Sequence, residues 1–304
     1  TKNIVCGNSL IGSHVLSGRL FNTEEERRLN PMDYETTFPK IIKEGGFDAI
    51  IGNPPYVEFK GLNKEIKDCL EKVYSSTTGK YDLFIPFIEK GIQLLKQEGY
   101  ISFILPSMFT KRDYGKSIRK FISENAYVQS LVYFGDFQVF NGVTVFPFIF
   151  IFSKEKVAKN YKTDIIYFPT QKGLSHDIVN ESLNIADSDA YSQKYKIQTV
   201  RLTSDTWQIS NESISSLKQK LQTDKETIMI KNITEYVFQG IASGKDEVFY
   251  INEATIRENK LEREIIHPIL KGKDVNEYNI KWSGVYCIYP YDSKTNKVIE
   301  ESKL

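Results

Sequence analysis

The chain has 304 residues, 26% of which are charged, and a formal net charge of +1. This is the composition of a globular protein long enough for two modest domains, and the near-neutral balance does not by itself indicate nucleic-acid binding. A protein of this composition that binds DNA must gather its basic residues on one face.

The cysteines and histidines exclude a disulfide framework and any metal site recognisable from spacing. Cys6, Cys69 and Cys287 lie far apart and form no CxxC pair, and the 3 histidines are isolated. The sequence has no run of eighteen apolar residues and no basic-then-apolar leader, which indicates no membrane association. We therefore expect a protein of the reducing cytoplasm without a bound metal.

The first part of the chain alternates expected strands and helices. Residues 3–6 form an apolar run that predicts a strand, and the polar residues 21–46 predict a helix and a loop. Residues 47–52 (FDAIIG) predict a buried strand that ends in a Gly-Asn-Pro-Pro turn. Apolar residues at i, i+3 and i+4 spacing predict a helix over 81–96, and residues 100–106 predict the next strand.

A further helix is expected over 112–125 and strands over 128–134 and 144–153, with a loop over 135–143. Strands that are apolar on both sides and alternate with helices predict an α/β fold with a parallel sheet covered by helices. Only a loop joins the last two strands, whereas a parallel crossover needs a dozen residues or more. The last strand is therefore expected to run antiparallel.

The composition changes beyond these strands. Residues 154–222 are rich in Lys, Ser, Asn and Gln and contain one expected strand at 165–168, whereas 228–304 hold short apolar pieces, many tyrosines and Gly-containing turns. We therefore expect two domains, residues 1–222 with the sheet and residues 223–304 as a smaller α+β module.

The turn Asn53-Pro54-Pro55-Tyr56 carries the clearest chemical signal. Ligands of doubly wound sheets bind beyond the carboxyl ends of the strands, and this turn follows such an end. The prolines keep the backbone extended and lack N–H donors, so the turn presents carbonyl oxygens, the Asn53 amide oxygen and an aromatic face. An exocyclic amine such as N6 of adenine offers the matching donors and a ring that can stack.

Two acceptors, the Asn53 amide oxygen and the Pro54 carbonyl, would draw the amine lone pair out of conjugation and make the nitrogen a better nucleophile towards a sulfonium methyl group. Stacking on Tyr56 would contribute about 1–3 kcal/mol, and the base would have to leave its duplex. The alternative is a tight turn without function. The preceding strand and Gly52, which allows close approach, favour the functional interpretation.

Several segments together resemble the gamma-class adenine-N6 DNA methyltransferases of restriction–modification systems, in particular the TaqI-like and type IIG (Eco57I-like) group. The segments similar to family motifs III to VI and VIII are 6–10 (CGNSL), 53–56, 79–84 (GKYDLF) with Phe87, 99–106 (GYISFILP) and the region of Val139 and Phe140. Segments 239–244 (QGIASG) and 268–275 (PILKGKDV) are similar to the opening of a target-recognition domain. The resemblance implies a Rossmann-like class I methyltransferase sheet, incomplete at its N-terminus, followed by a target-recognition module.

The resemblance also implies roles for single residues. Asn53 and Pro54 would bind the target amine, and Tyr56 and Phe140 would hold the flipped adenine between them. Phe140 lies in an expected loop, where a large apolar side chain is not easily explained as core.

Three positions are implied for the cofactor, S-adenosyl-L-methionine. Pro55 and Phe87 would contact its adenine ring. Asn8 stands where the family usually has Asp, and its amide oxygen would accept from the cofactor amine. Phe87 also lies on the helix face that packs on the sheet, so core packing is an equal alternative for that side chain.

The glycine-rich motif I of the family should precede motif III, and the chain begins at Thr1 before such a loop could fit. We therefore expect a fragment of a longer enzyme that binds the cofactor weakly and does not methylate by itself. Isothermal titration showing tight binding of S-adenosyl-L-methionine by residues 1–304 would contradict this.

The resemblance implies a site-specific enzyme that acts on double-stranded DNA, with an attached nuclease domain or a specificity subunit as possible partners. Two alternatives stay open. One is methylation of an amine or amide in RNA or protein, and the other is a non-catalytic DNA-binding or specificity subunit that has kept the fold. The module after residue 228 favours DNA.

Basic residues cluster at Lys111, Arg112, Lys116, Arg119 and Lys120. We interpret them as the solvated face of a helix, with phosphate contact as the alternative.

Overall fold

The computed structural model describes residues 4–15, 23–140, 146–155, 161–169, 172–224, 228, 232, 245–277, 279–291 and 298–299. The chain divides into two compact units, Thr1–Asp224 and Lys225–Leu304. The methyltransferase and target-recognition identities expected for residues 1–222 and 223–304 stay predictions. The segment 239–244, which resembles part of a target-recognition domain, lies outside the described residues.

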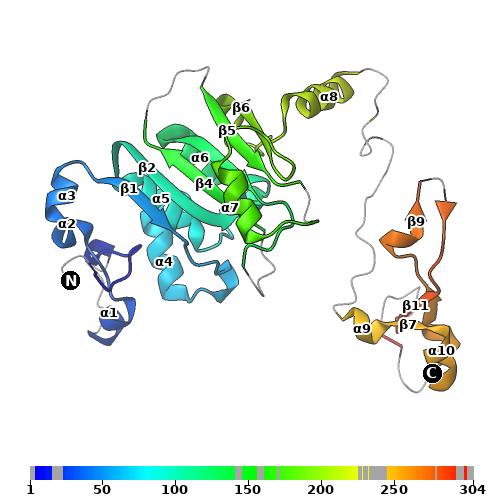
Figure 1. Cartoon of the computed structure of the whole chain (residues 1–304). Coiled ribbons are helices and arrows are strands. Elements are labelled where there is room, and N and C mark those ends of the chain that lie inside the picture. Colours follow the sequence, from blue (N-terminus) through cyan, green and yellow to red (C-terminus); the bar gives the residue numbers. More distant parts are fainter. Residues whose placement is uncertain are drawn as a thin grey trace. The chain divides into compact units, whose positions relative to one another are not determined.

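A mixed sheet forms the centre of the larger unit, and within the described residues it has six strands (Figure 1). The strands are β1 (Phe47–Gly52), β2 (Leu95–Pro106), β3 (Tyr127–Tyr133), β4 (Pro147–Ser153), β5 (Lys162–Tyr167) and β6 (Gln193–Gln198). Their order in space is β1-β2-β4-β3-β5-β6. β1 is parallel to β2 and β3 to β5, whereas β4 runs antiparallel to both β2 and β3, and β6 runs antiparallel to β5.

β4 confirms the expectation that the last strand of this part runs antiparallel. It lies between β2 and β3, where Phe150 is paired with Phe103 on one side and Leu131 on the other. Between β3 and β4, the described residues 134–140 and 146 contain no helix, whereas a parallel neighbour is usually reached through a crossover helix. The sheet is therefore mixed rather than wholly parallel.

Helices cover both faces of this sheet. The helices of the larger unit are α1 (Thr23–Leu29), α2 (Tyr34–Thr37), α3 (Pro39–Lys43), α4 (Lys64–Val73), α5 (Phe84–Leu94), α6 (Lys116–Asn125), α7 (His176–Asn184) and α8 (Glu212–Thr223). Leu131 belongs to the core cluster with α5 and α6, whereas its neighbour Val132 belongs to the cluster with Val179 of α7. Successive side chains of a strand point to opposite faces, so helices cover both faces of β3. This agrees with strands that are apolar on both sides.

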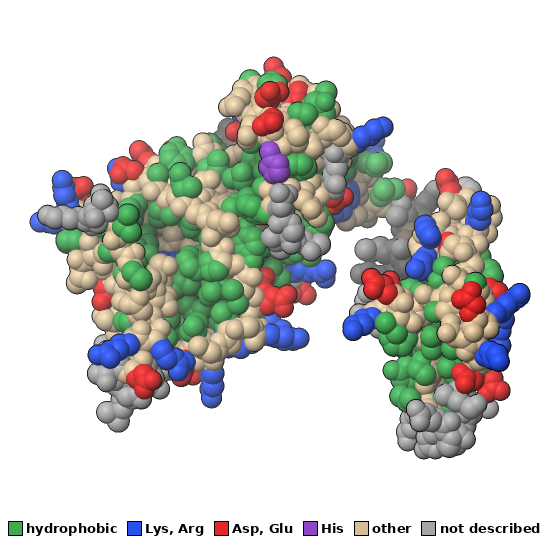
Figure 2. Space-filling model, turned by 60° about the horizontal axis from the view of Figure 1, so that its bottom comes forward, with side chains coloured by type: hydrophobic (Ala, Val, Ile, Leu, Met, Phe, Trp, Pro, Cys, Tyr) green, Lys and Arg blue, Asp and Glu red, His purple; other side chains and the backbone are tan. Residues whose placement is uncertain are grey.

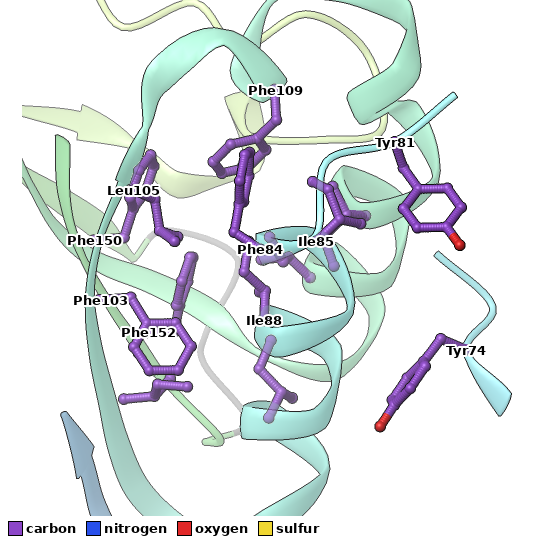
Figure 3. Close-up of a cluster of buried hydrophobic side chains, with 14 of the residues drawn as sticks. Tyr74, Tyr81, Phe84, Ile85, Ile88, Phe103, Leu105, Phe109, Phe150 and Phe152 are labelled. Atoms are coloured by element: carbon purple, nitrogen blue, oxygen red, sulfur yellow. The ribbon is translucent and has the colours of Figure 1, made fainter. Parts of the chain in front are cut away.

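Aromatic side chains fill the core between α5 and the sheet (Figure 3). The Phe109 ring centre lies 5.9 Å from that of Phe84 and 5.1 Å from that of Phe150. All three side chains are fully buried, and truncating such a ring typically costs about 3–5 kcal/mol. This packing fixes the first turn of α5 beside the end of β2, where the candidate site lies.

Some expected elements differ from the structure. Residues 4–6 have no regular structure and are exposed, so the strand expected over 3–6 is wrong for its described residues. The helix expected over 81–96 is α5 and ends at Leu94, because β2 begins at Leu95 and pairs there with Phe47.

The polar stretch 154–222 contains β6, α7 and α8, none of which was expected. Side-chain caps start both helices: Ser175 accepts from the Ile178 N–H (3.3 Å) and Asn211 from the Ile214 N–H (3.0 Å). Ser and Asn are favoured at such positions, so the cap residues were the available signal.

The smaller unit has its own β-structure. Among its described residues, a three-stranded sheet has the order β7-β11-β8, and β9 and β10 form a two-stranded pair, all antiparallel. Its elements are α9 (Asp246–Phe249), β7 (Tyr250–Asn252), α10 (Glu253–Glu258), β8 (Ile266–Pro268), β9 (Val275–Asn276), β10 (Asn279–Ile280) and β11 (Val285–Ile288). In the described parts of both units, no helix is long and apolar enough to span a membrane.

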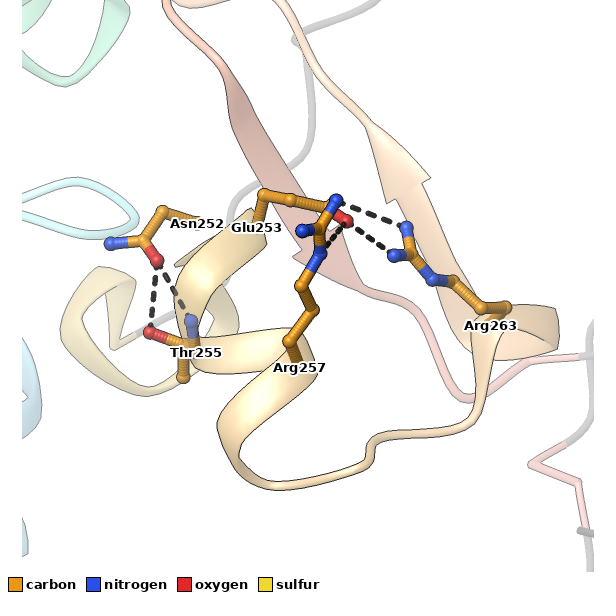
Figure 4. A network of polar contacts seen from close by, with 5 residues as sticks. All are labelled: Asn252, Glu253, Thr255, Arg257 and Arg263. Carbon is orange, nitrogen blue, oxygen red and sulfur yellow. Dashed lines mark hydrogen bonds and ion pairs between the residues drawn. The ribbon is translucent and has the colours of Figure 1, made fainter.

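An ionic network closes the start of α10 (Figure 4). Glu253 accepts from Arg257 (3.0 Å) and from Arg263 (2.5 Å), while Asn252 caps the helix by accepting from the Thr255 N–H (2.9 Å). The hydrogen bond from Arg263, with that from Arg257, lowers the pKa of Glu253 from 4.5 to about 2.

This network gives a prediction about acid. A depressed folded-state pKa stabilises the fold above the ordinary value of 4.5, and this contribution is lost as the pH falls towards about 2. We expect the Glu253 carboxyl carbon, followed by NMR, to titrate near pH 2 in the native chain. Arg263→Ala should bring the midpoint back towards 4.5, and a native midpoint already near 4.5 would contradict the network.

Candidate functional site

The tetrapeptide Asn53-Pro54-Pro55-Tyr56 leads the chain away from the end of β1. Asn53 and Pro55 are exposed, Pro54 is buried and Tyr56 is half-buried. The Tyr56 hydroxyl donates to the Ile104 carbonyl of β2 (3.0 Å), which ties the turn to the neighbouring strand. The Asn53 side chain makes no hydrogen bond to any described residue, so its amide is available to a ligand.

A cavity of about 460 Å³ opens on the Tyr56 side of this turn, and we call it the Tyr56 cavity. Its walls come from the residues after the turn, from the start of α5 and from the segment that follows β2. The volume of this cavity and its largely apolar walls are typical of a pocket that binds a small ligand. The lining residues are Tyr56, Glu58, Asp82, Phe84, Pro106, Ser107, Met108, Arg112, Tyr114 and Phe146.

Asp82 is the half-buried carboxyl group of the Tyr56 cavity. It lies two residues before α5, and a hydrogen bond from the N–H of the next residue, Leu83, to the Val57 carbonyl (2.8 Å) holds this position beside the turn. Burial raises the pKa of Asp82, the hydrogen bond from Tyr114 opposes that rise, and the charge of Glu58 adds to it. The cavity therefore holds a carboxylate in surroundings that disfavour its charge.

The two tyrosines of the Tyr56 cavity remain protonated at neutral pH. Burial raises the pKa of Tyr56 to about 12. Burial and the neighbouring Asp82 also raise the pKa of Tyr114 well above its ordinary range. Tyr114 therefore acts as the hydrogen-bond donor to Asp82.

A second cavity of about 260 Å³ opens on the Asn53 side of the turn, and we call it the Asn53 cavity. Its back wall depends on Gly52, which pairs with Phe103 of β2. A Cβ at position 52 would lie 3.0 Å from the Phe103 ring, so any side chain there would push this wall. The lining residues are Ser9, Tyr34, Ile50, Ile51, Gly52, Asn53, Pro54, Pro55, Phe87, Lys90, Gly91, Leu94 and Phe103.

Polar groups in the Asn53 cavity come from residues that sequence reasoning missed. Ser9 and Tyr34 are hydrogen-bonded to each other through their side chains, and Lys90 Nζ lies 4.9 Å from the centre of the Tyr34 ring. Burial lowers the pKa of Lys90. Lys90 follows Phe87 by three helical positions, and this spacing was the signal that could have placed both on one face.

The structure brings Asn53, Pro54, Pro55 and Phe87 together in the Asn53 cavity and places Tyr56 on the other side of the turn. Phe87 is half-buried, packs against the core and also lines the cavity, so both of its expected roles are compatible with its position.

Asn8 and Phe140 are absent from the linings of both cavities. The Asn8 amide oxygen accepts from the Leu10 N–H (3.1 Å), and its neighbour Ser9 is the lining residue. Phe140 is half-buried in a bend, and residues 141–145 after it lie outside the described residues. The cofactor role of Asn8 and the stacking role of Phe140 stay predictions.

Phe146 is an aromatic residue of the Tyr56 cavity that the sequence reasoning missed. Its side chain is 44% exposed, which is unusual for an aromatic ring and places it within reach of a ligand. The sequence predicts an apolar strand over 144–153 that would include it, whereas β4 begins at Pro147.

The rim segment, residues 107–115, is held in place by a buried arginine. Arg119 of α6 is 2% exposed, and its guanidinium donates to the carbonyls of Phe109 (2.5 Å), Arg112 (2.8 Å) and Ser204 (3.0 Å). The expectation that Arg119 belongs to a solvated helix face is therefore wrong. Carbonyls in a tight segment need donors, and Arg119 supplies them. Lys116 and Lys120 are exposed as expected.

Two substitutions of Tyr56 should separate its hydrogen bond from its ring. We expect Tyr56→Phe in the complete protein to change little, because only the bond to the Ile104 carbonyl is lost. If Tyr56 stacks on an extruded base, as the resemblance implies, Tyr56→Ala should weaken capture of that base by about 1–3 kcal/mol. Fluorescence of 2-aminopurine at the target position measures this, and equal signals for the two variants would contradict a stacking role.

The family comparison agrees with the ordered motifs. Residues 3–140 match the family model of the Eco57I restriction-modification methylase. The type II restriction enzyme and methyltransferase RM.Eco57I of Escherichia coli is 30% identical over 95% of this chain, which spans 28% of that protein. The type II methyltransferase M.BstVI of Geobacillus stearothermophilus is 26% identical over 81% of this chain, and 44% of it is covered. The chain thus spans less than half the length of these relatives.

Among solved structures, the type IIL restriction-modification enzyme MmeI in complex with DNA is similar in fold. The TM-score is 0.50 at 13% identity, with 86% of this chain and 31% of that chain covered. Together with the mixed, helix-covered sheet and the small separate sheet, this confirms the expected fold class.

In the part of the chain that the structure describes, no cluster of three or more His, Cys, Asp or Glu side chains is placed to hold a metal.

Proposed function

We propose that the complete protein methylates N6 of adenine in double-stranded DNA, with S-adenosyl-L-methionine as methyl donor. The premise is the match of residues 3–140 to the family model of the Eco57I restriction-modification methylase. The target adenine is flipped out of the duplex at a specific site. The observation that carries this proposal is the pair of cavities that meet at Asn53–Tyr56.

The two cavities suit two reactants that approach one turn from opposite sides. Tyr56 offers a ring for the target base, and Asn53 and Pro54 stand at the border of the second cavity. Holding both reactants in this geometry converts a bimolecular reaction into an effectively unimolecular one.

The residues of the Asn53 cavity fit the adenosine part of the cofactor. Ile50, Phe87 and Leu94 give apolar walls for a flat ring, and the hydroxyl of Ser9 offers a polar contact. Pro55 and Phe87 would contact the adenine ring. Asn8 stands outside this lining and would need to turn its amide oxygen from the Leu10 N–H to accept from the amine. When bound, S-adenosyl-L-methionine supplies an electrophilic methyl group on a sulfonium.

The turn prepares the amine of the target base for attack. The Asn53 amide oxygen and the Pro54 carbonyl accept from its two N–H groups, which favours a lone pair directed at the methyl group. Residues 54 and 55 are prolines and bring no competing N–H donor. Preorganised dipoles of this kind act most strongly where water is excluded, and Pro54 is buried.

DNA as the substrate is supported by the surroundings of the Tyr56 cavity. Lys111, Arg112 and Lys116 are exposed on or next to its rim, where they can meet phosphates. On the face of the larger unit seen in Figure 2, hydrophobic side chains gather at the centre, and Lys and Arg side chains stand along the lower border. We propose a cytoplasmic enzyme whose partners include a nuclease domain or a specificity subunit.

Analysis of the methylated product tests the proposal. The complete protein is incubated with duplex DNA and S-adenosyl-L-methionine, and the digested nucleosides are identified by mass spectrometry. N6-methyladenine is the expected product. N4-methylcytosine, or methylation confined to parallel RNA or protein substrates, would contradict the assignment, and no methylation at all would favour a non-catalytic specificity subunit.

A further inference from the structure

The carboxylates of the Tyr56 cavity are unexplained by recognition of neutral adenine. The ring nitrogens N1, N3 and N7 of adenine are acceptors, which a carboxylate cannot bond, and the proposed function gives both N6 hydrogens to the Asn53 amide oxygen and the Pro54 carbonyl. Asp82 and Glu58 nevertheless both line this cavity, and neither forms an ion pair with a described residue. A different property of the reacting base must account for them.

That property is the positive charge that methylation brings to the base. The lone pair of N6 forms the new bond to the methyl carbon, and the bond between that carbon and sulfur breaks with its electron pair left on sulfur. N6 then carries two hydrogens, the methyl group and a positive charge. It becomes neutral only when one proton leaves.

We propose that Asp82 stabilises the positive charge on the methylated base and accepts the proton that N6 releases, and that Tyr114 positions the Asp82 carboxylate for this task. The inference rests on the proposed function. The proton moves from N6 to a carboxylate oxygen, which leaves neutral N6-methyladenine and a neutral carboxyl group that later returns its proton to water.

The surroundings of Asp82 suit this role. Tyr114 occupies one lone pair of the carboxylate from the rim segment, so the remaining lone pairs are available to the cavity. Burial and the charge of Glu58 both disfavour the ionised form of Asp82. A cation in the cavity, or a proton bound to the carboxylate, therefore lowers the electrostatic free energy of this site. The lining charges are two negative and one positive, that of exposed Arg112, so a cationic base is the preferred occupant.

Equilibrium binding tests the charge preference without any methyl transfer. The complete protein is titrated by fluorescence anisotropy with two duplexes that carry its own recognition site, mapped beforehand from methylated DNA. One duplex has 1-methyladenine, which carries a positive charge at neutral pH, at the target position, and the other has neutral N6-methyladenine. The free energy of extruding a given base from the duplex is the same for every variant. We therefore compare, between variants, the ratio of the affinity for the cationic duplex to that for the neutral duplex.

We expect the ratio of affinities, cationic over neutral, to fall at least fivefold in Asp82→Asn and less in Glu58→Gln. Asp113→Asn is the matched control, because it removes the same charge from an exposed residue of the rim segment that does not line the cavity. It should keep the wild-type ratio. An unchanged ratio in Asp82→Asn would overturn the proposal.

The rate of methylation in a single turnover, measured at several pH values, tests whether Asp82 accepts the proton. The wild-type rate should fall as the pH drops through the raised pKa of Asp82, since protonation removes the negative charge. The other charged or titratable groups of this cavity are Tyr56, Glu58, Arg112 and Tyr114. Asp82→Asn should be at least tenfold slower near neutral pH and lack this acidic limb. If Asp82→Asn is slow but its rate still falls at acidic pH as in the wild type, Asp82 has only a structural role.

The outcomes also separate this inference from the proposed function. If the wild type forms N6-methyladenine but Asp82→Asn behaves as the wild type, only the role of Asp82 fails. If the wild type forms another product or none, the proposed function fails and the inference fails with it. Thermal unfolding of Asp82→Asn, expected to match that of Asp113→Asn, shows whether the variant is folded.

Discussion

Asn53→Ala should lower the methylation rate of the complete protein by about 10²–10³-fold, the range found when one preorganised hydrogen-bonding group is removed from a reacting centre. The Asn53 side chain is exposed, lines the Asn53 cavity and has no described hydrogen-bond partner, so its removal should not disturb the fold. Binding of DNA is expected to persist, because phosphate contacts dominate affinity. Methyl transfer measured in a single turnover, with DNA affinity measured in parallel, checks both statements.

Two further variants sharpen this prediction. Asn53→Asp keeps an oxygen acceptor at the same place and should be less impaired than Asn53→Ala. Asn125→Ala removes an exposed amide at the end of α6 and should leave the rate unchanged. If Asn53→Ala retains full activity, the amine is activated elsewhere. If neither Asn53→Ala nor the wild type methylates DNA and both bind it equally well, the result favours a non-catalytic DNA-binding subunit.

The turn at Asn53 could be predicted from sequence because its determinants are local. A continuous apolar run stops at Gly52, and two prolines fix the backbone that follows, so the strand end and the direction of the acceptors are set within a few residues. The antiparallel direction of β4 followed in the same way from the length of one connection.

The Tyr56 cavity could not be predicted in the same way, because its walls are built from segments far apart in the chain. Asp82 meets Tyr114 only after α5 and the rim segment have packed around Phe109. No local pattern encodes that meeting, and although segment 79–84 contains Asp82, nothing in the sequence assigns that carboxyl group a role. Phe146 was likewise hidden in an apolar run that looked like a longer strand.

Arg119 shows a different kind of failure. Ile118 and Ile122 are buried on α6 and Gly115 is buried at its N-cap, and position 119 lies four residues after Gly115 and three before Ile122, on the same face. The helical pattern therefore predicted burial, whereas the residue type suggested solvent. The pattern was the better guide, because the carbonyls of the rim segment offer a buried guanidinium the partners it needs.

Arg119→Met should destabilise the larger unit by about 3–5 kcal/mol, since each buried carbonyl left without its hydrogen-bond donor typically costs about 1–3 kcal/mol. Met replaces the aliphatic stem of Arg119 but leaves the carbonyls of Phe109, Arg112 and Ser204 without their donor. Arg119→Lys should rescue little, because one compact ammonium cannot reproduce the fork of a guanidinium.

Urea unfolding of the 304-residue chain measures this effect through tryptophan fluorescence. Trp207 is 2% exposed and its ring centre lies 5.8 Å from that of Phe109, so it reports on the rim segment, and Trp282→Phe removes the only other tryptophan signal. Lys120→Met is the matched control on the exposed side of α6 and should stay within about 0.5 kcal/mol of the wild type. A loss below about 1 kcal/mol for Arg119→Met would mean that water satisfies the three carbonyls. The rim of the Tyr56 cavity would then be held by packing around Phe109 rather than by Arg119.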